Sequence, residues 1–206
     1  AASRRLHRTA GNSVIVLGQI ARAGLDLARR VADEPGALLT LVVATGATAP
    51  PSRHVVAANS AYALALLAAA SPELATRVAD EPSALHALVA ARAAGGAVAS
   101  RSPQDPAIMR AENSALALAN IASADPGLAQ RTAEAPGALP ALVAAAAAGS
   151  CAAQQYQSAV AAIRSWALAA VAAAGSACGH CGHRADRAAG ERLRVCNSCN
   201  TARCCN

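Results

Sequence analysis

The sequence predicts an all-α fold, a solenoid of helical repeats followed by a small, incomplete zinc-binding module. A phrase of roughly twelve residues occurs three times, beginning at Leu27, Leu74 and Leu128, at offsets of 47 and 54 residues. The chain is rich in alanine and has no phenylalanine, a composition with high helix propensity. Six of the seven cysteines lie between Cys178 and Cys205. These three observations separate a helical array from a cysteine-rich C-terminal segment.

Each copy of the phrase predicts two short helices. An arginine occupies the same place in every copy, at Arg30, Arg77 and Arg131, and a proline follows five residues later. Because proline ends one helix and suits the first turn of the next, we expect a helix before each proline and another over residues 36–44, 83–94 and 137–148. The second helices carry apolar stripes at helical spacing: Leu38, Leu41 and Val42, then Leu85, Leu88 and Val89, then Leu139, Leu142 and Val143.

A second phrase keeps the same register, at residues 16–21, 63–68, 117–122 and, more weakly, 167–172. It predicts a third helix per repeat whose core pairs are Leu17 with Ile20, Leu64 with Leu67, and Leu118 with Ile121. The pairs Asn12-Ser13, Asn59-Ser60 and Asn113-Ser114 precede this phrase, and both residue types cap helices well. Each pair either starts the helix or, as residues 110–112 indicate for the third pair, lies within a longer one. Asp26, Ser71 and Asp125 are expected to open the next helix.

Three domains are expected: a frayed lead-in over residues 1–10, helical repeats over 11–175 and a zinc-binding module over 176–206. The unequal loops at 45–53, 95–106 and 149–155 explain the variable period. Because the chain starts at Ala1 and stops among cysteines at Asn206, we expect a piece of a longer protein. The alanine runs are too short to span a bilayer, so a soluble protein is expected. Because nothing in the sequence indicates secretion, we expect it to be intracellular, in the nucleus or cytoplasm.

The charge pattern favours protein partners over nucleic acid. The net charge is +6, and all 18 basic residues are arginine. They are scattered along the chain without aromatic side chains on which bases could stack, so most are interpreted as solvated helix faces. We therefore expect no nucleic-acid partner. No membrane is expected either, because the apolar runs are too short to span one.

Two C-x2-C pairs, Cys178 with Cys181 and Cys196 with Cys199, have the spacing of tetrahedral zinc ligands. Zinc is favoured over disulfides because nothing in the sequence indicates secretion. His180 and His183 are expected to be solvated neighbours, and Cys151 a small buried or loop residue. No catalytic residues are predicted, because a catalytic zinc keeps an open position with mixed ligands and a general base, and no other catalytic motif occurs.

Residues 136–143 and 117–122, together with Ser165-Trp166-Ala167-Leu168, resemble the armadillo repeat over about residues 11–175. The resemblance implies three-helix units stacked in a right-handed superhelix that binds other proteins. In peptide-carrying members, asparagines at one helix position grip an extended peptide. Here that position holds Gln19, Leu66, Asn120 and Ala170, and only Asn120 matches.

Residues 196–205 resemble the MYND-type zinc finger. The resemblance implies that Cys178 and Cys181 form the first ligand pair, Cys196 and Cys199 the second, and Cys205 the fifth ligand. Cys204 stands where the family has an aromatic residue. The remaining ligands would fall beyond Asn206, so these residues would hold one zinc through the four paired cysteines, or bind weakly through Cys178, Cys181 and Cys205. The complete finger is expected to recruit short proline-containing peptides, often in transcriptional regulation.

The predicted function is a non-catalytic protein–protein interaction scaffold that binds an unknown protein on its solenoid and zinc in its finger. One alternative is a ubiquitin ligase or its substrate adaptor with a ring-type finger, although His180 and His183 do not fit the ring order. Another is a nucleic-acid-binding zinc protein, supported by the arginines of the module: Arg184, Arg187, Arg192, Arg194 and Arg203.

Overall fold

A computed structural model of the chain describes residues 16–20, 22–46, 54–96, 105–148, 152–175, 194–195 and 203–204. The chain divides into two compact regions, Ala1–Ile163 and Arg164–Asn206. The first contains most of the described helices and is built of repeats. It is the part of the molecule that positions the candidate interaction surface.

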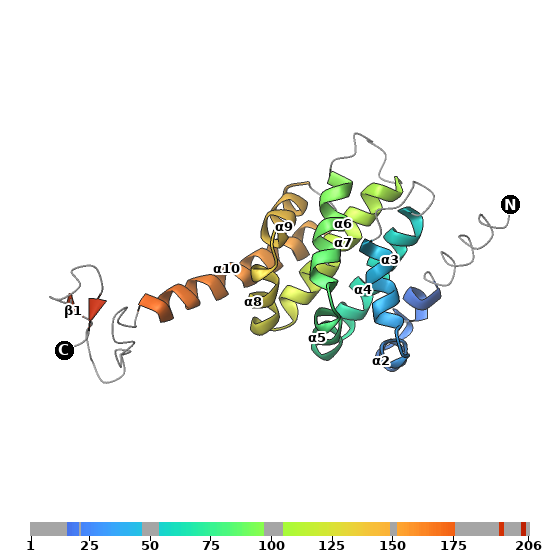
Figure 1. Ribbon diagram of the computed structural model, residues 1–206, viewed down its shortest axis with the longest axis horizontal. Helices are drawn as coiled ribbons and strands as arrows, with labels where there is room; N and C mark the ends of the chain where they lie inside the picture. Colours follow the sequence, from blue (N-terminus) through green and yellow to red (C-terminus); the bar gives the residue numbers. More distant parts are fainter. Residues whose placement is uncertain are drawn as a thin grey trace. The chain divides into compact units, whose positions relative to one another are not determined.

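The repeats are three-helix units, as the sequence predicts (Figure 1). The first unit consists of α2 (Leu25–Asp33), α3 (Ala37–Gly46) and α4 (His54–Ala70). The second consists of α5 (Pro72–Asp80), α6 (Ala84–Gly96) and α7 (Pro106–Ala124). The third consists of α8 (Pro126–Glu134), α9 (Ala138–Ala147) and α10 (Ala153–Gly175). Residues 16–20, which precede the first unit, are also helical.

Equivalent helices of successive units pack on one another. The second helices α3, α6 and α9 follow one another in one layer, and the third helices α4 and α7 form the most extensive contact of the stack. The predicted core pairs Leu64 with Leu67 and Leu118 with Ile121 are fully buried. Alanines such as Ala61 lie between the bulky residues with no exposed surface, so α4 and α7 can approach closely. The core is therefore continuous from unit to unit.

The apolar stripes of the second helices differ in burial between the first unit and the third. Leu38, Leu41 and Val42 are buried, because α6 packs over α3. In contrast, Val143 of the third stripe is 42% exposed. Val143 sits on α9, the last second helix among the described residues, so no equivalent helix covers it there.

The two Asn-Ser pairs that the structure describes do not cap helices. Asn59 and Ser60 lie in the second turn of α4, which begins at His54, and Asn113 and Ser114 lie well inside α7. The described pairs therefore support the longer-helix alternative. Helix α7 is instead capped by Asp105, whose Oδ1 accepts a hydrogen bond from the Ala107 N–H at 2.8 Å. The pair Asn12-Ser13 lies outside the described residues.

The predicted boundaries before the first helices hold in two units and shift in one. The Ser71 hydroxyl accepts from the Leu74 N–H at 3.2 Å, and the Asp125 carboxylate accepts from the Leu128 N–H at 2.9 Å. In the first unit the N-cap is Gly24, which has no side chain to cap the helix. Asp26, expected at this boundary, lies in the first turn of α2, where its charge favours the positive helix end.

The turn between first and second helices needs a left-handed residue at the same place in each unit. Gly36 has φ of 75° and Gly137 has φ of 85°, whereas the second unit places Ser83 there with φ of 64°. This geometry suits glycine because a Cβ atom clashes with the following carbonyl. The serine is thus a strained variant of a repeated turn.

In the compact region Arg164–Asn206, β1 (Arg194–Val195) and β2 (Arg203–Cys204) pair antiparallel. Arg194 lies opposite Cys204, and Val195 lies opposite Arg203. The segment between the two strands contains Cys196 and Cys199. The all-α prediction therefore holds for the described helical units but not for this short pair of strands.

Candidate interaction surface

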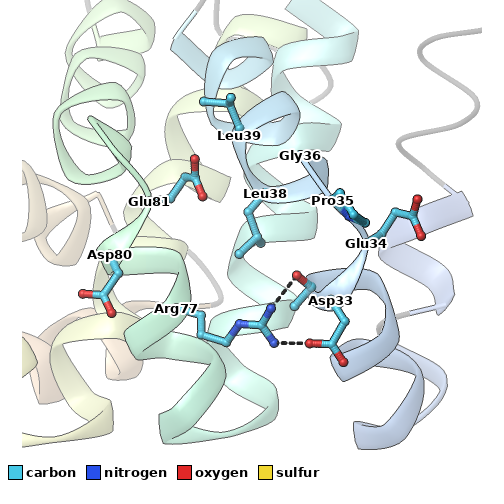
Figure 2. A pocket seen from close by; sticks show the side chains of 10 residues that line it. Asp33, Glu34, Pro35, Gly36, Leu38, Leu39, Arg77, Asp80 and Glu81 are labelled. Carbon is cyan, nitrogen blue, oxygen red and sulfur yellow. Dashed lines mark hydrogen bonds and ion pairs between the residues drawn. The ribbon is translucent and has the colours of Figure 1, made fainter.

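Two arginines join successive units at their first helices. The Arg77 guanidinium on α5 donates to Asp33 Oδ1 and to the carbonyl oxygen of Ala32, both at 2.6 Å (Figure 2). One unit later, Arg131 on α8 donates to Asp80 Oδ1 at 2.7 Å and to the Ala79 carbonyl at 2.8 Å. Each arginine thus binds the last turn of the preceding first helix, where carbonyl groups lack partners within the helix.

Arg77 and Arg131 are exceptions to the interpretation of most arginines as solvated helix faces. Arg77 and Arg131 are only about one-third to two-fifths exposed, at 34% and 40% of their side chains. The signal was present in the sequence, because Asp33 and Asp80 each follow the repeated arginine by three residues. What the spacing did not reveal is that each arginine pairs with the acid of the preceding unit. Arg30, the first of the series, is exposed.

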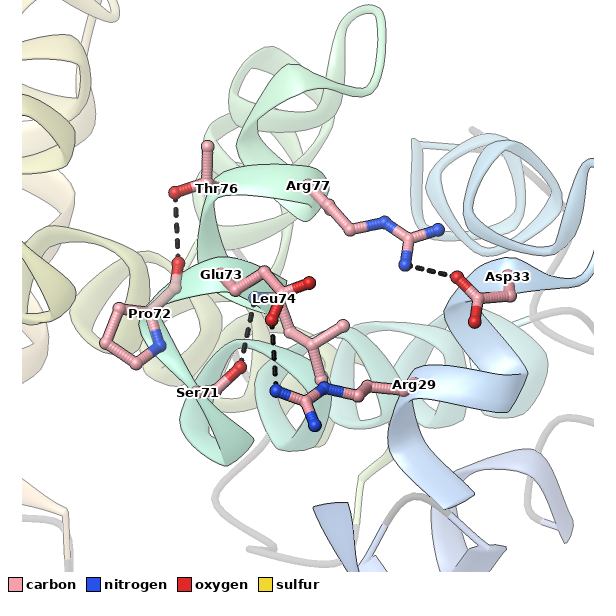
Figure 3. A network of polar contacts seen from close by, with 8 residues as sticks. All are labelled: Arg29, Asp33, Ser71, Pro72, Glu73, Leu74, Thr76 and Arg77. Atoms are coloured by element: carbon pink, nitrogen blue, oxygen red, sulfur yellow. Dashed lines mark hydrogen bonds and ion pairs between the residues drawn. The ribbon is translucent and has the colours of Figure 1, made fainter. Parts of the chain in front are cut away.

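A second ion pair supports the same junction. Arg29 Nη2 on α2 lies 3.1 Å from Glu73 Oε2, in the first turn of α5 (Figure 3). Both side chains are largely exposed, so this pair contributes little to stability by itself. Together with the Arg77–Asp33 contact, it fixes the register of α5 against α2.

A pocket of about 560 Å³ opens beside this junction (Figure 2). Its lining includes the carboxylates of Asp33, Glu34, Asp80 and Glu81 and a single guanidinium, that of Arg77. Asp33 and Asp80 already accept hydrogen bonds from the arginines that join the units. The pocket is therefore acidic, but part of its charge is used in stacking the repeats.

The third helices carry a row of partly exposed residues at equivalent positions. On α4 the row is Val55, Asn59, Tyr62 and Leu66, and on α7 it is Met109, Asn113, Leu116 and Asn120. The spacing within each helix places these residues on one face, and the offset between the helices is 54 residues. We call these eight residues the third-helix face.

Two asparagines of the third-helix face also join the helices. Asn113 Nδ2 donates to the Ala58 carbonyl and Asn120 Nδ2 donates to the Ala65 carbonyl, each at 2.9 Å. A primary amide has a second N–H and a carbonyl oxygen with two lone pairs. Each asparagine is therefore oriented by one hydrogen bond and keeps further donor and acceptor capacity for a partner.

The four positions that correspond to the asparagine ladder of peptide-carrying proteins carry side chains that differ in type and exposure. Asn120 is half-buried and oriented by its bond to α4, and Leu66, at the same position of α4, is half-buried against the core. Gln19 is exposed. The side chain of Ala170 lies outside the described residues. The ladder is therefore a mixed row in which only Asn120 has the expected residue type.

Comparison with known proteins supports the fold of these repeats. No protein-family model and no curated protein matches the chain. Among solved structures, the chain is similar to a designed armadillo repeat protein, with 27% sequence identity and a TM-score of 0.59. The alignment covers 74% of this chain and 57% of the designed protein.

The helical repeats are armadillo-like. This confirms the fold class predicted for them, and armadillo-like repeats are generally protein-interaction scaffolds. None of the described helices combines the length and apolar character needed to cross a bilayer. The third-helix face of the armadillo-like array is therefore the candidate interaction surface.

The predicted zinc ligands lie outside the described residues: Cys178, Cys181, Cys196, Cys199 and Cys205. The same holds for His180, His183 and Cys151. In the described part of the chain, no group of three or more His, Cys, Asp or Glu side chains could hold a metal ion. The zinc site consequently stays a prediction from the sequence.

Proposed function

We propose that the protein is a non-catalytic interaction scaffold whose armadillo-like array binds an extended segment of another protein along the third-helix face. The observation that supports this most directly is the pair of oriented carboxamides, Asn113 and Asn120, within a row of partly exposed apolar side chains. An extended peptide has unpaired backbone N–H and C=O groups. A primary amide can donate to one and accept from the other.

The apolar members of the face supply the second part of the recognition. Val55 and Met109 occupy the same repeat position and are 46% and 38% exposed. Tyr62 and Leu116 share another position, one turn beyond Asn59 and Asn113. Apolar side chains of a partner could bury this surface while the carboxamides hold its backbone, a division of roles common in peptide recognition.

Selection of peptides from a phage-displayed random library against the full chain tests this proposal. The peptides obtained are synthesised, and their affinities are measured for the wild type and for the double variant Val55→Ser with Met109→Ser. Loss of two apolar contacts should weaken binding at least about tenfold. Both residues are exposed, so the variant should retain the helical circular dichroism of the wild type.

Val43→Ser is the matched control. Val43 is 62% exposed and lies on the second helix α3, which contributes no residue to the third-helix face. Its affinity for the selected peptides should equal that of the wild type. Equal loss in Val43→Ser and the double variant, or no loss in either, would rule out the third-helix face as the binding surface.

We further propose that the C-terminal segment binds zinc as part of a MYND-type finger that recruits proline-containing peptides. The support is the pair of C-x2-C motifs, Cys178 with Cys181 and Cys196 with Cys199. The antiparallel strands β1 and β2 flank the second motif in the sequence. A short hairpin holds the ends of its connecting segment together, which suits a segment that supplies two ligands to one ion.

A further inference from the structure

Arg110, in the second turn of α7, is a charged residue within the core of the repeat array. The residue is only 4% exposed to solvent. Its Nε makes no hydrogen bond, and none of the three ion pairs among the described residues includes it. It is thus unlike Arg77 and Arg131, each of which has a carboxylate and a carbonyl partner.

The equivalent positions in the neighbouring units are apolar. At the offsets of 54 and 50 residues that relate the repeats, Arg110 corresponds to Val56 on α4 and Val160 on α10. Val56 packs against the core and Val160 is 7% exposed. The stack therefore requires an apolar side chain at this position in the other two units, and the charge is specific to the second.

The serine one turn further along α7 differs from its counterpart in the same way. In the first unit, the Ser60 hydroxyl donates to the carbonyl oxygen of Val56 at 2.9 Å. In the second unit, Ser114 is completely buried and its hydroxyl has no hydrogen-bond partner. Residues four apart lie on the same face of a helix, so Arg110 and Ser114 share one buried face of α7.

Burial makes an unpaired arginine unfavourable, and arginine cannot relieve the cost by losing its proton. Desolvation lowers the pKa of Arg110 below its ordinary value. That value is so high, however, that the guanidinium stays charged at neutral pH. A buried charge requires an opposite charge with hydrogen bonds, and an acceptor that binds Arg110 could also accept from Ser114.

We propose that Arg110 and Ser114 form a binding site for a small oxyanion, such as inorganic phosphate, inside the second repeat. The guanidinium supplies the charge and a forked set of N–H donors that matches two oxygen atoms, and the serine hydroxyl supplies a further donor. The site stabilises the folded array when the anion is bound. This inference is independent of peptide binding on the third-helix face.

Thermal unfolding of the full chain in phosphate and in chloride, at matched ionic strength, tests the site. Saturating phosphate should raise the Tm of the wild type by at least about 3 °C, because a ligand that binds only the folded state stabilises it. Arg110→Met replaces the charge with an apolar chain of similar length. It should abolish the phosphate-specific shift and raise the Tm in chloride, where the wild type carries an uncompensated charge.

Arg30→Met is the matched control, since it removes the same charge from an exposed position. It should keep the full phosphate shift, which separates a specific site from the general stabilisation that phosphate gives by exclusion from protein surfaces. An equal shift in Arg110→Met and the wild type would overturn the proposal. If Arg110→Met does not fold, calorimetric titration of the wild type with phosphate decides: saturable one-to-one binding supports the site and absence of binding refutes it.

Discussion

Arginines at different positions of the array differ in whether they have hydrogen-bond partners in the fold. Arg77 and Arg131 lie at the edge of the first-helix layer, where each binds both a side chain and a main-chain carbonyl of the preceding unit. Arg110 lies in the core without a partner of this kind. Position in the repeat, rather than residue type, thus decides whether an arginine finds partners in the preceding unit.

Replacement of Arg131 by alanine should lower the free energy of unfolding by about 1 kcal/mol. The half-exposed ion pair with Asp80 contributes little to stability in water. Most of the loss therefore comes from the hydrogen bond to the Ala79 carbonyl. Equilibrium urea denaturation followed by circular dichroism measures the change.

Arg30→Ala is the control for this prediction, because Arg30 has the same repeat position and is exposed. Its substitution should change the free energy of unfolding by less than about 0.5 kcal/mol. If both substitutions have the same effect, the contact between units contributes nothing beyond the intrinsic preference of the residue for a helix.

At the scale of the element, the turn between first and second helices shows how closely the repeats share a backbone. All three turns use a positive φ at equivalent positions, although the second has Ser83 where the others have glycine. Their surroundings differ as well. A Cβ atom on Gly36 would have nothing within 4 Å, whereas one on Gly137 would lie 3.1 Å from Val89 Cγ1.

Ser83→Gly should stabilise the protein by about 0.5 to 1 kcal/mol. Relief of the left-handed strain outweighs the greater backbone freedom that glycine has in the unfolded chain. The expected rise in Tm is about 2 °C or more. Differential scanning calorimetry of the variant and the wild type provides the comparison.

The reverse substitution, Gly36→Ser, is the matched control. Because the space around Gly36 is open, the only cost should be that of the backbone conformation, and the Tm should fall by a similar amount. A stabilising Gly36→Ser, or a destabilising Ser83→Gly, would show that strain in this turn is not what sets its stability.

For the whole molecule, we expect the helical array to fold without metal and the C-terminal segment to depend on it. The repeats have a continuous apolar core, whereas the proposed zinc module owes its folding to its ligands. Elemental analysis should find about one zinc per chain, held by four cysteines. Chelation should remove the metal and leave the helical circular dichroism and the main thermal transition unchanged.

The double variant Cys196→Ser with Cys199→Ser should lose the zinc, since it removes half of the ligand set. Cys151→Ser should retain it, because this cysteine lies outside both C-x2-C motifs. A chain without zinc after expression in zinc-supplemented medium, or equal loss in both variants, would refute the zinc proposal.

The candidate site was only partly predictable from the sequence. The Asn120 position was identified, but its hydrogen bond to Ala65 was not, because the two residues are far apart in the sequence. The asparagine-serine pairs were ambiguous for a related reason. Good capping residues are also compatible with a helix interior when their side chains find partners on a neighbouring helix, as Asn113 does with Ala58.

The sequence by itself determined the three-helix repeat, the breaks at Ser71 and Asp125 and the buried positions of the third helices. These features depend on local patterns: apolar spacing, capping residues and prolines within one unit. The tertiary structure alone decided which side chains join one unit to the next and that, among the described residues, no carboxylate pairs with the buried Arg110. Such properties depend on contacts between residues about fifty positions apart, and only the stacking of the helices brings those residues together.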